Sequence, residues 1–136
     1  MNTSTTAEGT QTKVEITLSN GLVGFPLAQH FSLTATPEGL YEMQCLDMPD
    51  MAFVVIAPSP FFPEYSPKID VETTQRLSLE SEDDALVLLL VNLGAEDEQP
   101  GVNLLAPVVV NRHTREAAQV VLADQDLPLR AALPLD

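Results

Sequence analysis

The sequence predicts an all-β fold, mainly antiparallel, in the form of a small β-barrel-like single domain with one or two short helical turns. Some short segments alternate apolar and polar residues, and others are apolar throughout and rich in valine. Turn-forming residues separate these segments at intervals of about 10 to 15 residues, which favours a sheet that curls to protect its edges. At 136 residues, with 45% hydrophobic residues, the chain fits one domain with a modest core.

Alternating strands dominate the first third of the predicted domain. Residues 1–12 are polar and lack periodicity, so we expect a disordered N-terminal tail. The two-residue period of half-buried strands begins at residue 13. It occurs in KVEITL (13–18), HFSLTAT (30–36) and YEMQC (41–45). A turn at residues 37–39 joins the last two segments into a hairpin with one solvent-exposed face.

Three later segments are apolar at every position, which favours strands covered on both faces. They are AFVVIA (52–57), ALVLLLV (85–91) and APVVV (106–110). For ALVLLLV, periodicity alone leaves a buried helix as the alternative. The polar turn NRHTR (111–115) leads into AAQVVL (117–122), which predicts a second hairpin. The predicted domain covers residues 13–130, followed by a C-terminal tail at 131–136.

Helical signals are limited to two places. Residues 73–79 can form one or two turns, and Ser81 followed by three acidic residues is typical of a capped first turn. Gly21 and Gly24 in SNGLVGFP lack the spacing of a phosphate loop and are interpreted as turn glycines.

The charge of the chain is strongly negative, with 20 acidic and 6 basic residues and a net charge of −14. This potential would repel phosphate backbones and anionic lipid head groups, so we expect no direct binding to nucleic acid or membrane. It would steer basic proteins toward the chain; acidity that only maintains solubility is the alternative. Acidic runs at 80–84 and 96–98 flank ALVLLLV, which predicts one strongly negative side of the barrel, or else two solvated loops.

Candidate catalytic residues are few. His30 and His113 are the only imidazoles, and both are interpreted as surface residues. Cys45, the only cysteine, points inward in its predicted strand and is interpreted as a small buried hydrophobe. The sequence has no spacing typical of a soft-metal site or a calcium loop. We therefore expect no enzyme activity, no cofactor and no metal, with a small hydrolase using scattered carboxylates as the alternative.

The cysteine count and the apolar runs also bear on location. A single cysteine allows no intramolecular disulfide, and residues 1–12 lack the basic start and apolar run of an export signal. The apolar runs are far shorter than the roughly 18 residues that a membrane-spanning helix needs. We expect a cytoplasmic protein.

Two segments combine rigidity with possible contact surface. Residues 47–67 hold four of the seven aromatic residues and five of the eleven prolines. The prolines restrict the backbone around the FFPEY loop, which suits either a rigid corner of the core or a preformed contact surface, with Tyr65 the ring expected to be most exposed. Pro107 in VNLLAPVVVN cannot donate to a ladder, which predicts an edge strand open to a partner segment. The alternative is that Pro107 only blocks aggregation there.

Several segments, taken together, resemble the flagellar assembly factor FliW family. They are NGLVGFP (20–26), QCLDMPDMAFVVIAPSPFFPEY (44–65), ALVLLLVNL (85–93), VNLLAPVVVNRHTREAAQVVL (102–122) and PLR (128–130). The resemblance covers residues 14–130 in the same order, and the combination of LDxPDxAFVV, FFPxY, VNLxAPxVxN and QVVL is specific. Val23 stands where a proline is common and Cys45 where a serine is common, and residues 1–12 match nothing.

The resemblance implies a cytosolic regulator with two protein partners. One is flagellin before its export, and the other is the carbon storage regulator CsrA, an RNA-binding translational repressor. When export depletes flagellin, the released factor would bind CsrA allosterically and relieve repression of flagellin translation. A charge of −14 suits a partner that presents positive charge to RNA. The alternative is a flagellin export chaperone without CsrA regulation, and we expect a monomer when no partner is bound.

Candidate partner-contact residues come from the aromatic loop, the second acidic run and the predicted edge strand. They are Phe61, Phe62, Tyr65, Glu96, Asp97, Glu98, Asn103, Leu104, Leu105 and Pro107.

Overall fold

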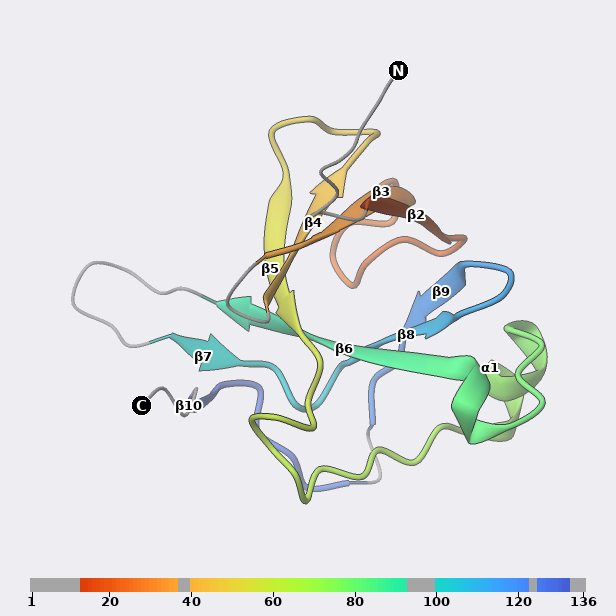
Figure 1. Cartoon of the computed structure of the whole chain (residues 1–136), viewed down its shortest axis with the longest axis vertical. Helices are drawn as coiled ribbons and strands as arrows, with labels where there is room; N and C mark the ends of the chain where they lie inside the picture. The colour runs from red at the N-terminus through yellow and green to blue at the C-terminus, as the bar shows by residue number, and fades with distance from the viewer. Residues whose placement is uncertain (1–12, 37–39, 93–99, 123–124, 133–136) are drawn as a thin grey trace.

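The structure is a computed structural model that describes residues 13–36, 40–92, 100–122 and 125–132. These residues form one nine-stranded sheet and two short helical segments, α1 (Val71–Arg76) and the 3-10 turn η1 (Glu82–Asp84) (Figure 1). The strands are β2 (Lys13–Leu18), β3 (His30–Ala35), β4 (Leu40–Cys45), β5 (Ala52–Ile56), β6 (Ala85–Asn92), β7 (Gly101–Val102), β8 (Val108–Asn111), β9 (Glu116–Gln119) and β10 (Ala131–Ala132). The predicted all-β class is confirmed, and ALVLLLV forms a strand.

The sheet closes into a barrel because β6 is long enough to pair with β5 along one part of its length and with β8 along another. Residues 85–88 of β6 pair with β8, and residues 89–91 pair with β5. The closed ring runs β2, β3, β4, β5, β6, β8, β9 and back to β2. Only the β2–β9 pair is parallel among the described strands. β7 and β10 extend the sheet at the end of β6, so residues 131–132 pair with β7 rather than forming part of a tail.

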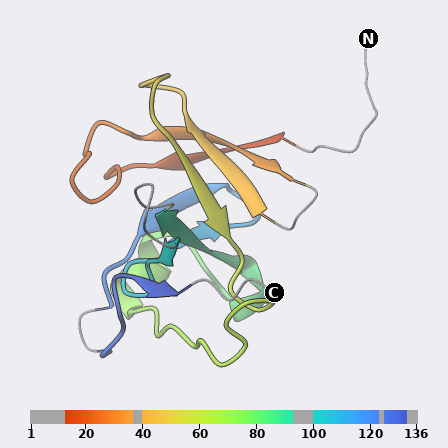
Figure 2. The ribbon, with the colours of Figure 1, turned by 90° about the vertical axis from the view of Figure 1, so that its left-hand side faces the viewer.

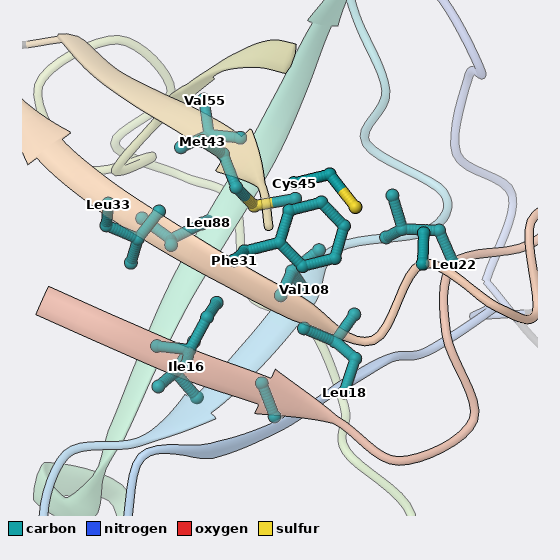
Figure 3. Close-up of a cluster of buried hydrophobic side chains, with 13 residues drawn as sticks. Ile16, Leu18, Leu22, Phe31, Leu33, Met43, Cys45, Val55, Leu88 and Val108 are labelled. Atoms are coloured by element: carbon teal, nitrogen blue, oxygen red, sulfur yellow. The ribbon is translucent and has the colours of Figure 1, made fainter. Parts of the chain in front are cut away.

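The barrel interior is filled by the inward-facing residues of the alternating strands. Phe31 of β3 lies at the centre of the cluster, with Met43 and Cys45 of β4 beside it (Figure 3). Ile16 and Leu18 of β2 close the cluster on one side. The predicted alternation is confirmed except at Ser32, a polar residue of β3 that is also buried, and Cys45 is a buried hydrophobic residue, as expected.

The 57–84 connection and residues 125–132 run along the outside of the barrel (Figure 2). Side chains from both segments pack against two further apolar clusters. One outer cluster is centred on Ile56, Leu89 and Val102, and another places Leu77 against Val109. β8 is buried at all four residues because it lies between the interior and these outer clusters, as predicted for a strand covered on both faces. The prediction is only partly right for β5 and β6, in which residues 52–54 and 85–87 are exposed or half-buried.

The bounds of α1 differ from the helical turns predicted at residues 73–79. α1 begins at Val71 rather than residue 73, because Asp70 is the N-cap and its Oδ1 accepts a hydrogen bond from Thr73 N at 2.8 Å. The capped turn expected at Ser81 is present as η1. Among the described residues, no helix is long and apolar enough to cross a membrane.

Candidate functional site

An apolar groove of 280 Å³ opens at one mouth of the barrel, where β2 and β6 end and β5 begins. Its floor is formed by Phe53 of β5 and Leu90 of β6, whose side chains pack against the barrel core. The 20–26 turn forms one wall, and the segment from Asn103 to Ala106 forms another. Residues from six separate parts of the chain therefore meet at this mouth, which we call the apolar groove.

The rim of the apolar groove exposes large hydrophobic side chains to solvent. Val23 is 62% exposed, Phe25 46%, Val121 52% and Leu129 65%. Apolar residues scattered singly over a surface need no explanation, but here four of them line one depression. A concentration of this kind is typical of a surface that binds another protein.

The 20–26 turn is held rigidly over the groove. Leu22 N donates to Phe25 O at 3.1 Å, and Phe25 N donates to Leu22 O at 2.8 Å. Gly21 and Gly24 take left-handed backbone angles, with φ of 70° and 86°, which confirms both as turn glycines. The turn therefore presents Val23 at a fixed position.

Gln119 connects the two walls of the groove. Its Oε1 accepts a hydrogen bond from Val23 N at 2.7 Å, and its Nε2 donates to Ala106 O at 3.1 Å. Asn103 shapes the second wall, because its Oδ1 accepts hydrogen bonds from Leu105 N and Ala106 N, both at 3.0 Å. The groove is thus a preorganised surface, which lowers the entropy cost of binding.

The edge strand expected at Pro107 is not observed. Pro107 is buried and immediately precedes β8, which pairs with β6 on one side and β9 on the other. Its carbonyl accepts a hydrogen bond from Val120 N at 2.9 Å, and Leu105 O accepts one from Leu122 N at 2.8 Å. The missing N–H of Pro107 therefore delays the start of β8 to Val108, and backbone pairing continues around it instead of ending in an edge.

The aromatic loop packs onto the outside of the barrel. Phe61, Phe62 and Tyr65 are all half-buried against the outer clusters, so Tyr65 is not distinguished by exposure. Tyr65 Oη donates to Leu104 O at 2.7 Å, and burial raises the pKa of Tyr65 to about 12. Leu104 is itself buried. Of the two roles open to this loop, the contacts support closure of the core.

Of the remaining predicted contact residues, Asn103 and Leu105 line the apolar groove. Glu96, Asp97 and Glu98 lie outside the described residues.

The two histidines lie on the surface, as predicted, and each is next to a carboxylate. His113 Nε2 is 2.9 Å from Asp84 Oδ1, and His30 Nδ1 is 3.1 Å from Asp47 Oδ1. A hydrogen bond from Glu80 N, followed by the one with His113, lowers the pKa of Asp84 below its usual value. Bonds from the backbone N–H groups of residues 30 and 29 lower the pKa of Asp47 in the same way. Both acids thus have structural partners, which favours local roles at turns and strand ends.

The titratable groups of the described segments do not assemble into a metal centre. No three or more His, Cys, Asp or Glu side chains among these residues lie together as ligands would. The thiol of Cys45 is 1% exposed and packs in the barrel core, away from solvent.

Sequence reasoning missed the exposed rim of the groove. A signal was available, because Val23, Phe25 and Leu129 are large apolar residues within or next to turn-forming glycines and prolines. The segments NGLVGFP, AFVV, ALVLLLVNL, VNLLAP, QVVL and PLR each contribute at least one lining residue. These segments meet only because the barrel closes, and no local sequence pattern predicts that closure.

The chain is similar to one protein-family model, to relatives from several organisms and to a solved crystal structure. The family model described as "FliW protein" matches residues 2–133. A flagellar assembly factor FliW from Treponema pallidum is 39% identical over 119 residues, which cover 84% of this chain and 79% of that protein. One from Anoxybacillus flavithermus is 31% identical over 110 residues, covering 80% and 76%. A crystal structure of the flagellar assembly factor FliW superposes with a TM-score of 0.81 at 26% identity, covering 90% of this chain and 86% of that one.

Proposed function

Because the chain belongs to the FliW family of flagellar assembly factors, we propose that it binds flagellin in the cytoplasm and, once released, binds the translational repressor CsrA. Binding to CsrA would antagonise its RNA binding and so relieve repression of flagellin translation. The protein acts in this scheme as a binding regulator without catalysis. Its relatives are named for an assembly role, which agrees with such a function.

The observation that carries the proposal is the apolar groove. It combines a preorganised hydrogen-bonded frame with four exposed apolar side chains, which is the composition expected at the centre of a protein–protein contact. The surrounding chain has a net charge of −14, which favours encounter with a basic partner such as an RNA-binding repressor. Apolar contact would then supply most of the affinity, and the negative charge would raise the association rate and favour basic partners over others.

A matched pair of substitutions tests whether the groove binds the partners. Val23→Asp places a charge on the groove rim, whereas Val71→Asp places the same charge at the start of α1, on a residue of similar exposure that does not line the groove. Isothermal titration with purified flagellin and with CsrA should show at least a tenfold loss of affinity for Val23→Asp and a change within about threefold for Val71→Asp. Equal behaviour of the two variants toward both partners would rule out the groove as the contact surface.

The chaperone alternative differs from this proposal only in its second partner. A chain that binds flagellin but shows no saturable binding to CsrA would support the chaperone without regulation. Where CsrA binds, titration of RNA, CsrA and this protein together separates allosteric from competitive antagonism. A detectable ternary complex supports the allosteric route, whereas an affinity that falls in direct proportion to RNA at all concentrations excludes it.

The hydrolase alternative is tested by removing the candidate catalytic groups. His30→Ala, His113→Ala and Cys45→Ser should each leave partner binding within about threefold, a difference below ~1 kcal/mol. Loss of function in a variant that remains folded by circular dichroism would instead favour catalysis.

A further inference from the structure

The opposite mouth of the barrel holds a second cavity, of 350 Å³, that shares no lining residue with the apolar groove. It lies where β2, β4 and β6 begin and β3 and β8 end. Ile16 and Leu33 line it and lie at one end of the interior cluster, whereas Leu22, which lines the groove, lies at the other end (Figure 3). Its volume falls within the range of small-molecule sites.

The lining of this second cavity combines an apolar wall with hydrogen-bond donors. Leu86 and Val110 continue the apolar surface, and Arg112, Arg115 and Tyr41, whose side chains carry hydrogen-bond donors, also line the cavity. In the part of the chain that the structure describes, the ion pairs are the two His–Asp pairs, so neither arginine has a carboxylate partner there. Two of the six basic residues of a chain with 20 acidic ones thus face one apolar cavity without a counter-ion among those residues.

The turn that carries the arginines is fixed by hydrogen bonds. Asn111 is 2% exposed, and its Oδ1 accepts bonds from His113 N at 2.8 Å and Thr114 N at 3.1 Å. Arg115 N donates to Asn111 O at 2.8 Å, and Arg112 N donates to Asp84 O at 2.8 Å. The backbone at both arginines is therefore held in place at the rim of the cavity.

Arg115 also has a strained backbone, with φ of 68°. Glycine or asparagine adopts this left-handed conformation more readily than arginine does. Strain of this kind concentrates at ligand-binding positions, where the side chain has a role that a turn residue could not fill. The observation therefore points to a function for the guanidinium of Arg115.

We propose that this cavity binds a free medium-chain monocarboxylate. The guanidinium forks of Arg112 and Arg115 would bind the carboxylate through charge-assisted hydrogen bonds, and the apolar chain would lie against Ile16, Leu33 and Leu86. A single negative charge suits the site better than a phosphate dianion, because the overall potential of a chain with a charge of −14 repels multiply charged anions more strongly.

Octanoate is the probe for the test. Its binding is measured by calorimetry and by the amide chemical shifts of the isotope-labelled full chain. We expect saturable binding of one octanoate per chain. Acetate and octan-1-ol should bind at least tenfold more weakly, because acetate lacks the apolar chain and octan-1-ol lacks the carboxylate. The double variant Arg112→Gln, Arg115→Gln should lose at least tenfold in affinity. Arg76→Gln is the control, because Arg76 is an exposed arginine of α1 that does not line the cavity, and its affinity should be unchanged.

Arg115→Gly separates a binding role from a structural one. The substitution relieves the left-handed strain and removes the guanidinium, so the melting temperature should rise while octanoate affinity falls at least threefold. The proposal is overturned if octanoate does not saturate, if octan-1-ol binds equally well, or if the double variant binds as the parent does. It is also overturned if a peptide with an apolar C-terminal residue binds through its free carboxylate, and not as its amide, while octanoate fails. Binding of octanoate does not involve the apolar groove, so this result is independent of flagellin and CsrA.

Discussion

At the scale of single residues, the two turn glycines share a conformation but differ in their surroundings. Both have positive φ, so an alanine at either position is strained. A Cβ at Gly21 would lie 2.5 Å from Pro26 O, whereas a Cβ at Gly24 would meet nothing within 4 Å. Gly24→Ala should therefore lower the free energy of unfolding by about 1 kcal/mol, from conformation alone.

Gly21→Ala should cost about 3 kcal/mol, because a clash with backbone adds to the same strain. Denaturant titration of both variants measures the difference. Equal losses would show that the turn shifts to accommodate the new methyl group, and that it does not hold Val23 rigidly over the groove.

Tyr65 gives a prediction about pH. Its pKa is raised to about 12 by burial, whereas an unfolded tyrosine titrates near ~10. The contribution of the buried neutral phenol to stability is therefore fully present below pH ~10, and it is lost as pH rises toward ~12, because the unfolded state loses its proton first. We expect the free energy of unfolding to fall over this interval.

Tyr65→Phe is the control for that pH dependence. It removes the titrating group and the bond to Leu104 O, so at neutral pH it should cost about 1 kcal/mol. Its free energy of unfolding should fall less steeply than that of the parent between pH ~10 and ~12. Parallel pH profiles for the two proteins would show that the Tyr65 phenol ionises as easily in the folded state as in the unfolded one.

At the scale of elements, two asparagines fix the segments on either side of β8, and they do so in different ways. Asn103 uses its Oδ1 to bind two backbone N–H groups of the groove wall. Asn111 uses both ends of its amide: Nδ2 donates to Leu77 O at 2.7 Å, at the end of α1, while Oδ1 holds the following turn. An aspartate reproduces the first set of bonds and cannot reproduce the second, because it has no donor.

Asn103→Asp should change the free energy of unfolding by less than ~1 kcal/mol, because both acceptor bonds survive. Asn111→Asp should cost about 3 kcal/mol or more, because it buries a carboxylate facing the Leu77 carbonyl. Chemical denaturation of the two variants at neutral pH provides the comparison. Similar losses at the two positions would contradict the assigned roles of the two amides.

The same elements show what the sequence can and cannot predict. The hairpin of β3 and β4 follows from alternation within each strand, which is local information, and it was predicted correctly. The edge predicted at Pro107 was wrong, because the partner of its carbonyl is Val120, which proline chemistry alone does not identify. The apolar groove was missed for a similar reason. Its rim residues Val23 and Leu129 are more than a hundred positions apart in the chain, and only barrel closure brings them together.

At the scale of the whole molecule, the barrel separates two kinds of surface. One mouth carries the apolar groove, and the other carries two arginines around an apolar cavity. The acidic run at 80–84 precedes β6, and the run at 96–98 follows it in the chain. The proposed binding of a basic partner therefore combines apolar contact at the groove with a negative electrostatic field that arises from charges across the whole chain.

Charge reversal tests whether that field acts as a whole or through one local patch. Lysine at each of residues 96–98 removes three acids and adds three bases, and lysine at Glu80, Glu82 and Asp83 makes an equal change elsewhere, leaving the turn acid Asp84 intact. If the overall field steers CsrA, both triple variants should slow its association several-fold at low salt and flatten the salt dependence of the rate. Dissociation should change little, in contrast to Val23→Asp, which should speed it, because loss of apolar contact acts mainly after encounter. Stopped-flow association at two ionic strengths gives the answer: an effect confined to residues 96–98 would replace the overall field with a local acidic contact beside the partner.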